Sequence, residues 1–446
     1  MSIEVISFGC RLNSYEGEVI KKHAASACLE NTIILNSCSV TSEAERQLRQ
    51  TIRKIRKQNP DAKIVITGCA AQINPEKYAT MPEVDAVIGN LEKVELSAYQ
   101  QIAARSNMHA NVDNTSLSID DEVQDPKFTD TIGLNPHIMD KPKARLQAYK
   151  NESVIVSDIQ EAKELAQHLI SGFENRARAF MQVQNGCNHR CTFCIIPYGR
   201  GNSRSIPVGE ITKQAMILVD NGYKEIVITG VDITDYGLDL PGKPRLGQML
   251  KRLLQIVPQI ERIRLSSLDV AEIDEDLLDL IAYEPRLMPH LHLSLQSGDN
   301  MILKRMKRRH SAEQVVEFCK KIEKLRPNIA LGADVIVGFP TETDEMYENT
   351  KNLVQDLGIC HLHVFPYSER DGTPAARMPQ VARDIRKKRA KDLREVGTMV
   401  LKKRHQNMIG KTVTVLLEDG GGAWKNRRLL RRSSIESADG DREYNP

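Results

Sequence analysis

The stretch NGCNHRCTFCIIPYGR, residues 185–200, places three cysteines in one short segment. Cys187, Cys191 and Cys194 are separated by three and two residues, so a single loop can present three thiolates to one point. Three thiolates bound to a four-iron cluster leave one iron without a protein ligand. An open coordination position is typical of reactive metal centres. The segment therefore predicts a cluster whose free iron can chelate a small molecule.

Two simpler interpretations compete with this one. The cysteines can belong to a zinc site whose fourth ligand lies elsewhere, for example His189, or they can be unrelated buried thiols. Phe193 just before the last cysteine and Gly186 just before the first argue against chance. The pattern resembles that of the radical S-adenosylmethionine enzymes. This resemblance implies that the open iron binds the amino and carboxylate groups of S-adenosylmethionine, and that Phe193 lies against the adenine.

Size and composition limit the class of protein. A chain of 446 residues with 41% hydrophobic residues is long enough for two or three domains with ordinary cores. We find neither a secretory segment at the amino terminus nor an apolar run that could span a bilayer, so we expect a cytoplasmic protein without a membrane partner. Nine cysteines in such a protein indicate metal ligands or catalytic groups rather than disulfides.

The overall charge says little about partners, because the net charge is only +3. Three segments in the second half are locally basic: residues 304–310 (KRMKRRH), 386–391 (RKKRAK) and 402–405 (KKRH). Such runs are commonly solvated helix faces. Their number favours a polyanionic partner.

The first hundred residues alternate strand-like and helix-like segments, which predicts a parallel sheet. Expected strands are residues 3–8, 32–35, 63–67 and 84–88, and expected helices are residues 14–28 and 42–57, the latter capped by Thr41. Cys10, Cys38 and Cys69 follow the first three strands. Because parallel strands end at the same edge of a sheet, we expect these thiols to converge. Cys28 lies in a helix-like stretch and is interpreted as a packing residue.

These cysteines can also be incidental small residues in loops. Their surroundings, SFGCRLNSYE, LNSCSVTSEAE and ITGCAAQ, resemble the amino-terminal domain of the methylthiotransferases, in which that domain precedes a radical S-adenosylmethionine domain. The resemblance extends from about Ile3 to about Val415. It implies that Cys10, Cys38 and Cys69 hold a second four-iron cluster.

The domain organisation follows from these segments. We predict an amino-terminal domain in residues 1–100, an insertion or linker in 101–155, a radical S-adenosylmethionine core in 173–400, and a small β (TRAM-like) module in 405–446. Residues 106–151 are rich in Asn, Asp, Ser and Lys without a sustained period, which favours a surface insertion. Methylthiotransferases usually have a shorter link between these two domains, so the length of residues 106–151 departs from the family pattern.

Six further strand-like runs are separated by helices and predict an open (β/α)6 barrel, the form usual in this superfamily. They are residues 179–184, 225–229, 262–266, 290–295, 331–337 and 361–365. The three-cysteine loop follows the first of them, at the carboxyl end where barrel active sites lie. At the same end, Gly230, Ser294 and Gln296 are candidates for contacts to the nucleoside cofactor.

The family resemblance implies a reaction that replaces a C–H bond by C–S–CH3. It uses two molecules of S-adenosylmethionine, two four-iron clusters and a reducing, flavodoxin-like electron donor, and we expect a monomer. The segments CTFCIIPYGRGNSRS and GVDITDYG are closest to the branch that modifies N6-threonylcarbamoyladenosine at position 37 of tRNA. Alternatives are isopentenyladenosine in tRNA or an aspartate of a ribosomal protein. Outside this class remain an iron–sulfur electron carrier and a nucleic-acid-binding protein with structural zinc.

The end of the chain departs from the family. Methylthiotransferases usually end in a small β-barrel module that binds RNA, and residues 410–418 (GKTVTVLLE) resemble its first strand. Residues 420–446 lack period-two alternation. We therefore predict a truncated or degenerate module with weakened tRNA affinity, in which Arg427, Arg428, Arg431 and Arg432 can still contact phosphates.

Overall fold

A parallel sheet forms the amino-terminal part of the computed structural model, which describes residues 3–112, 153–165, 168–173 and 176–417. The strands are β1 (Ile3–Ser7), β2 (Thr32–Ser37), β3 (Lys63–Gly68), β4 (Ala86–Ile88) and β5 (Val154–Ile155). They pair in the order β1-β2-β3-β4-β5, and every neighbouring pair is parallel. The four strands expected from the sequence are therefore confirmed.

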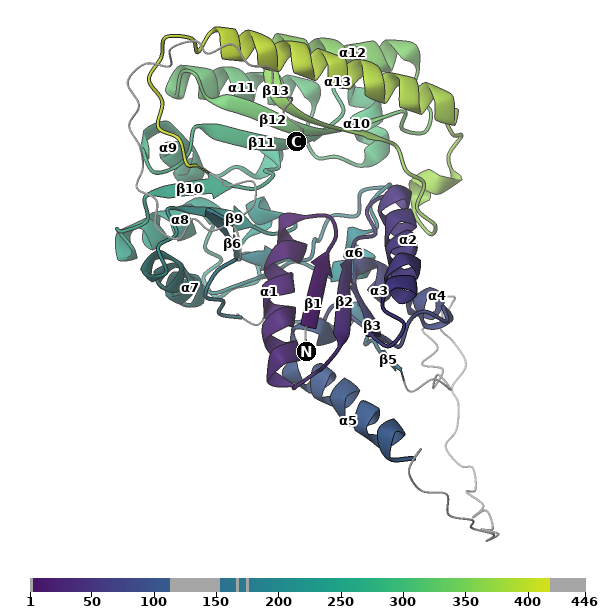
Figure 1. Cartoon of the computed structure of the whole chain (residues 1–446). Coiled ribbons are helices and arrows are strands. Elements are labelled where there is room, and N and C mark those ends of the chain that lie inside the picture. Colours follow the sequence, from purple (N-terminus) through teal and green to yellow (C-terminus); the bar gives the residue numbers. More distant parts are fainter. Residues whose placement is uncertain (1–2, 113–152, 166–167, 174–175, 418–446) are drawn as a thin grey trace, which may run out of the picture.

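Helices cover both faces of this sheet (Figure 1). They are α1 (Arg11–Ser26), α2 (Ser42–Gln58), α3 (Cys69–Ile73), α4 (Pro75–Ala79), the 3-10 turn η1 (Glu92–Val94) and α5 (Leu96–Val112). Every residue of β2 is buried, because apolar clusters lie on both sides of the sheet. The Thr41 side chain accepts a hydrogen bond of 3.1 Å from the amide of Ala44, which confirms the expected cap of α2.

The predicted linker, residues 101–155, is partly wrong. Its first part belongs to α5, which continues to Val112, and its last part contains β5, which pairs with β4. Alternation alone could not reveal a strand of two residues whose partner lies far away in sequence. Residues 113–152 lie outside the described residues.

Six parallel strands form the barrel. They are β6 (Arg178–Gln182), β9 (Glu225–Thr229), β10 (Arg262–Leu265), β11 (His290–Gln296), β12 (Ala330–Val337) and β13 (Ile359–Pro366). Two sheets, β10-β9-β6 and β11-β12-β13, are joined by the parallel bridges Ile263–Leu287 and Leu268–Leu293. Since β6 and β13 are not paired with each other in the described sheets, the barrel is open, and the predicted six-unit α/β architecture is confirmed.

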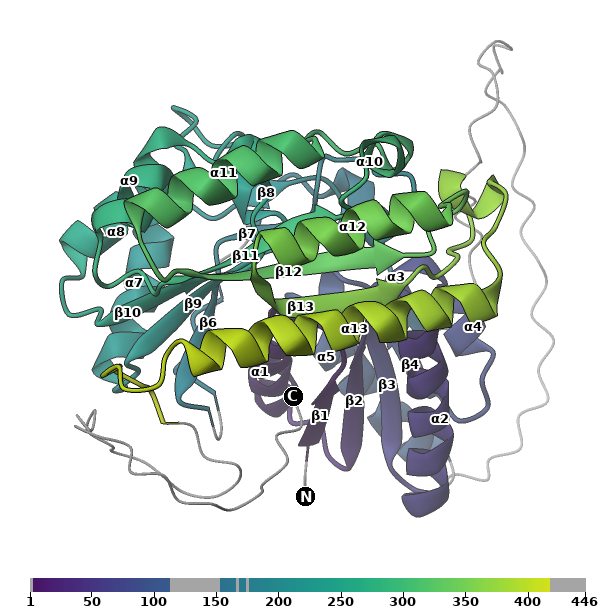
Figure 2. The ribbon, with the colours of Figure 1, turned by 90° about the horizontal axis from the view of Figure 1, so that it is seen from above.

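The barrel is surrounded by helices that pack on one large core, except for residues 300–306, which pack in a smaller cluster with Phe339 and Tyr367. They are α7 (Val208–Asp220), α8 (Leu246–Ile256), α9 (Glu275–Tyr283), α10 (Asn300–Met306), α11 (Ala312–Leu325), α12 (Asp344–Asp356) and α13 (Arg383–Gln406). Figure 2 shows α13 running along β13. Five short elements complete the first half of this region: η2 (Ile159–Glu161), β7 (Gln184–Asn185), α6 (Ile196–Arg200), β8 (Arg204–Ser205) and η3 (Ile233–Asp235). Two more 3-10 turns, η4 (Val270–Glu272) and η5 (Pro374–Arg377), lie further along the chain. None of the described helices combines the length and the apolar character needed to cross a membrane.

Helix α1 joins the two parts of the molecule. Its residues Tyr15 and Val19 belong to the barrel core, although the helix also covers the amino-terminal sheet. The Tyr15 hydroxyl donates a hydrogen bond of 2.6 Å to the carbonyl of His168. The carboxyl ends of the first three strands are thereby held against the barrel.

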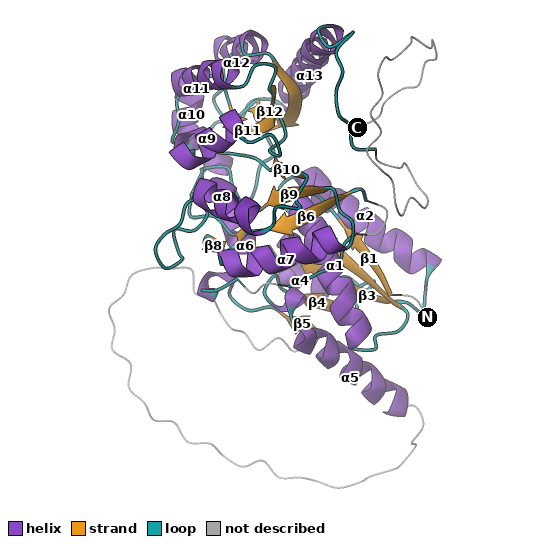
Figure 3. Cartoon of the chain, turned by 90° about the vertical axis from the view of Figure 1, so that its left-hand side faces the viewer, coloured by secondary structure: helices purple, strands orange, loops and turns teal. Residues whose placement is uncertain are grey.

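The strand expected at residues 410–418 is not formed in its described part. Residues 411–417 follow α13 as a loop (Figure 3). Val413, Val415 and Leu417 are 45–46% exposed, and no described segment pairs with them. An alternating apolar pattern cannot form a strand without a neighbour to accept its hydrogen bonds. Residues 418–446, including the four candidate arginines, lie outside the described residues.

Candidate active site: two groups of three cysteines

The loop between β7 and α6 carries Cys187, Cys191 and Cys194, called here the barrel trio. The amide of Cys187 donates to the carbonyl of Gly201 over 3.1 Å, and that of Cys194 donates to the carbonyl of Cys191 over 3.1 Å. Gly186 has φ of +75°, and a Cβ there would lie 1.9 Å from the carbonyl oxygen of Asn202. Glycine is thus required at the position just before the first cysteine.

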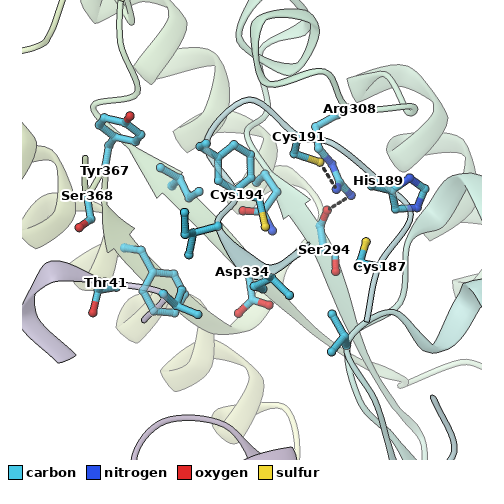
Figure 4. Close-up of a pocket in the computed structure, with 18 of the residues that line it drawn as sticks. Thr41, Cys187, His189, Cys191, Cys194, Ser294, Arg308, Asp334, Tyr367 and Ser368 are labelled. Atoms are coloured by element: carbon cyan, nitrogen blue, oxygen red, sulfur yellow. Dashed lines mark hydrogen bonds between the residues drawn. The ribbon is translucent and has the colours of Figure 1, made fainter. Parts of the chain in front are cut away.

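All three thiols of the barrel trio line one cavity of about 280 Å³ (Figure 4). Its other lining residues come from the cysteine loop, from the strand ends of the barrel, from the loop after β2 and from the segment after α10. They include Val40, Thr41, His189, Phe193, Val231, Asp232, Asp269, Ser294, Gln296, Arg308, Asp334, Ile336, Phe365 and Tyr367. Because this cavity opens beside the thiols, it can hold a small molecule against them.

Three of the four predicted cofactor contacts, Phe193, Ser294 and Gln296, line the cavity. The fourth, Gly230, is not among the lining residues. A Cβ at Gly230 would lie 2.8 Å from Oε1 of Gln184, which accepts the amides of the next two residues at 3.0 and 2.9 Å. Gly230 therefore acts indirectly: its small size lets the following loop, which carries Asp232, close over β7.

Arg308 is a cavity residue that sequence reasoning missed. Its Nη1 lies 3.6 Å from Sγ of Cys191, and its Nη2 donates to Asp269 over 2.8 Å and to the carbonyl of Ser294 over 3.0 Å. Burial would raise the pKa of Asp269, but a hydrogen bond with His310 and the charge of Arg308 hold it below its usual range. A guanidinium beside a cysteine sulfur stabilises the thiolate form that an iron ligand requires.

The basic runs are less solvated than expected. In residues 304–310 the chain leaves α10 through Lys307, which has φ of +61°, and turns Arg308 and His310 into the interior. In residues 386–391 the side chains of Arg386 and Arg389 are buried. The first run turns inward at the left-handed Lys307, whereas the second buries its cations within a continuous helix, so the sequence itself carried no signal for either.

His189 is paired with acids. Its Nε2 lies 3.0 Å from Asp232 and 3.6 Å from Glu272. Hydrogen bonds to Asp232 and to Glu272 raise the pKa of His189 to about 10. The same nitrogen also contacts the Arg309 guanidinium. In this structure the His189 ring is therefore held by charged side chains.

Cys10, Cys38 and Cys69, called here the sheet trio, lie at the carboxyl ends of β1, β2 and β3. Cys38 and Cys69 are buried and Cys10 is exposed. Gly9, at φ of +88°, approaches Cys38 so closely that a Cβ there would lie 2.9 Å from its Sγ. Burial first, and then the neighbouring Cys69 and Cys10 thiols, raise the pKa of Cys38 to about 11. The structure thus brings the three together, whereas Cys28 is exposed after α1, and its interpretation as a packing residue is wrong.

Buried charges connect the two trios. Arg200, at the end of α6, donates to Glu16 of α1 over 2.8 and 3.0 Å, and Lys93 donates to the same carboxylate over 2.6 Å. All three side chains are at most 3% exposed. The Asn90 amide lies 3.6 Å from Sγ of Cys69 and also donates to the carbonyl of Gly199 in α6. The segment that leaves the barrel trio therefore packs directly on the sheet trio.

The charges of this network suit an anionic group at the sheet trio. Two buried cations meet one buried carboxylate, so one positive charge remains uncompensated within the three residues. The nearest thiols are Cys69 and Cys10, whose negative forms raise the pKa of Arg200. Burying a cation without a partner is costly. Three thiolates around an iron–sulfur cluster would supply the missing negative charge, so the residues of the sheet trio fit such a cofactor, as the cavity and Arg308 fit one at the barrel trio.

Comparisons with known proteins agree with the fold. The model of the radical SAM superfamily matches residues 181–354, and that of the uncharacterized protein family UPF0004 matches residues 2–89. A radical S-adenosylmethionine methyltransferase, TsrM from Kitasatospora setae, superimposes with a TM-score of 0.54 at 13% identity, covering 84% of this chain and 74% of that one. This likeness shows the fold. An open six-strand barrel with the barrel trio in its first loop defines a radical S-adenosylmethionine enzyme.

Relatives define the family more narrowly. The threonylcarbamoyladenosine tRNA methylthiotransferase MtaB of Rickettsia prowazekii is 51% identical over 416 residues, 93% of this chain and 87% of that protein. MtaB of Aquifex aeolicus is 33% identical over 98% of this chain and 96% of that protein. The tRNA-2-methylthio-N(6)-dimethylallyladenosine synthase of Ehrlichia chaffeensis is 32% identical over 97% of this chain and 91% of that protein. The chain belongs to the methylthiotransferase family, and this membership decides against an electron carrier or a zinc-containing nucleic-acid-binding protein.

Proposed function

We propose that this chain transfers a methylthio group to C2 of N6-threonylcarbamoyladenosine at position 37 of tRNA, with a four-iron cluster on each trio and two molecules of S-adenosylmethionine. The observation that carries the proposal is the packing of α6 against Cys69, which brings the sheet trio next to the loop of the barrel trio. The MtaB relative at 51% identity supports the choice of nucleoside.

Different residues of this chain bind the nucleoside cofactor and form the walls of its cavity. When bound, the clusters supply the electron that cleaves one S-adenosylmethionine and the sulfur that is methylated by the other. Phe193 and Ile336 offer apolar cavity surface, and Ser294 and Gln296 offer polar atoms for a nucleoside cofactor. Val40 and Thr41, which directly follow the Cys38 loop, line the same cavity and bring the sheet domain to its wall. In the overall change a C–H bond is replaced by C–S–CH3.

The partners follow from this chemistry. The substrate is tRNA, a flavodoxin-like reductant supplies electrons, and the chain acts as a monomer. Isopentenyladenosine in tRNA is the second candidate, because relatives at 32% identity are named as dimethylallyladenosine synthases.

The deciding experiment is anaerobic reconstitution of the clusters, followed by reaction with tRNA carrying either threonylcarbamoyladenosine or isopentenyladenosine and by nucleoside mass spectrometry. We expect the methylthio product of the first tRNA alone. Product from the second tRNA alone would assign the chain to the other branch. If neither tRNA gives product although both clusters are loaded, both assignments are contradicted. The next substrate to test would then be the ribosomal-protein aspartate.

A further inference from the structure

A group of two imidazoles and one carboxylate lies on the sheet β11-β12-β13, outside both cysteine trios. His292 comes from β11, Asp334 from β12 and His363 from β13, three neighbouring parallel strands. Nε2 of His292 and Nδ1 of His363 each lie 3.1 Å from the same atom, Oδ1 of Asp334. Asp334 also lines the cavity that contains the barrel trio (Figure 4).

The spacing matches that of ligands around one ion. Zinc–nitrogen bonds of about 2.0–2.1 Å place neighbouring ligand atoms about 3.0–3.4 Å apart in octahedral or tetrahedral geometry. The three ligand atoms here all lie within 4.8 Å of one another. Two histidines and one carboxylate are a donor set for zinc or ferrous iron that leaves coordination positions open.

His292 has a buried nitrogen at this point. Its side chain is 9% exposed, and its Nε2 lies 3.1 Å from Oδ1 of Asp334 without an oriented hydrogen bond to any described residue. A buried polar nitrogen without an oriented hydrogen bond is destabilising. Coordination of a metal ion would satisfy this lone pair.

Neighbouring residues support the same arrangement. The Ser267 hydroxyl donates to Oδ2 of Asp334 over 3.3 Å, which leaves Oδ1 for the two imidazoles. A hydrogen bond to the second oxygen orients a carboxylate ligand. Gly332 makes room for His292, because a Cβ there would lie 2.6 Å from its Nδ1. The His363 side chain is 59% exposed, so the site is accessible to an ion from solvent.

We propose that His292, Asp334 and His363 bind one divalent transition metal ion, zinc or ferrous iron, beside the reaction cavity. This site uses none of the six cluster cysteines. It therefore has its own ligands, although Asp334 also lines the cavity that contains the barrel trio.

The test measures zinc on the full-length protein with its clusters reconstituted. The protein is equilibrated with free zinc near 1 µM, desalted and analysed for zinc and iron by mass spectrometry. We expect about one zinc per chain in the wild type, and loss of that zinc in H363A and D334N with iron unchanged. H361Q is the matched control, because His361 lies on the same strand outside the three ligands, and it should retain the zinc.

X-ray absorption at the zinc edge of the wild type needs no variant and identifies the donors. Nitrogen and oxygen scattering alone supports the site. Zinc–sulfur scattering, no retained zinc, or equal zinc in the wild type and H363A would overturn it. Methylthio product is measured on the same samples, so that missing product with zinc bound would contradict the proposed function and leave the metal site standing.

Discussion

The three thiols of each trio are brought together in a different way. The barrel trio occupies one loop, and its thiols line an open cavity. The sheet trio depends on the parallel order of β1, β2 and β3, and buried charges enclose it on the side of α6. Local spacing is sufficient for the first group, whereas the second exists only when the whole domain is folded.

The largest expected effect is the loss of activity when a cysteine of either trio is removed, and it should show that the two trios have different functions. C194A should reduce methylthiolation by at least about a thousandfold and also abolish cleavage of S-adenosylmethionine, because the barrel trio loses its cluster. C38A should abolish methylthiolation but leave cleavage to 5′-deoxyadenosine. Nucleoside mass spectrometry and deoxyadenosine analysis on reconstituted protein measure both. C28S is the control, since Cys28 is exposed outside both trios. Full cleavage of S-adenosylmethionine by C194A would contradict the assignment of that cleavage to the barrel trio.

The next effect concerns the buried network of Glu16, Arg200 and Lys93 beside the sheet trio. R200Q leaves Glu16 with one cation and removes the bridge from α6 to α1, and breaking a buried ion pair costs about 3–5 kcal/mol. We expect lower thermal stability and loss of iron chiefly from the sheet trio, measured by denaturation and by iron content in a C194A background. K224Q removes the exposed pair Lys224–Glu261 and should cost less than about 1 kcal/mol. Equal losses of stability and iron in R200Q and K224Q would show that the buried network of Glu16, Arg200 and Lys93 does not support the sheet trio.

The pH dependence of stability should also reflect this network. Burial would raise the pKa of Glu16, but the charges of Arg200 and Lys93 lower it to about 2. A lowered pKa contributes stability that is present above the usual glutamate pKa and is lost as pH falls toward 2, because the unfolded chain then binds the proton first. Denaturant unfolding of the cluster-free chain between pH 6 and about pH 3 should show a steeper loss in the wild type than in E16Q. Parallel curves would contradict this assignment.

The smallest effect concerns the apolar wall of the cavity. Phe193 packs edge-to-face on Phe339 with ring centroids 6.3 Å apart, and F193L removes the ring proposed to lie against the adenine, an aromatic contact worth about 0.5–1.5 kcal/mol. We expect S-adenosylmethionine to bind about three- to tenfold more weakly, with both clusters retained. Calorimetric titration of the reconstituted protein measures the affinity. F193Y keeps the ring and is the matched control; unchanged affinity in F193L would place the adenine elsewhere.

Sequence reasoning was strongest where chemistry and spacing coincide. The barrel trio could be found from one loop, and the sheet trio from alternating strands, since parallel topology fixes where strand ends meet. It missed Asp232, which lies 3.7 Å from Sγ of Cys187, and Arg308, which lies 3.6 Å from Sγ of Cys191, because their approach to the thiols depends on how separate strand ends pack. It could not tell which cations of the basic runs are buried, as Arg386 is, because composition does not reveal which face of a basic segment is covered.

Helix α1 has a practical consequence for engineering. Its Tyr15 and Val19 complete the barrel core, while its Glu16 receives Arg200 from the barrel. In a chimera that joins this amino-terminal domain to the barrel of a distant relative, the contacts between α1 and the barrel would therefore not match. Exchange of modules within the family should therefore take α1 and the barrel from the same protein, because their contacts match.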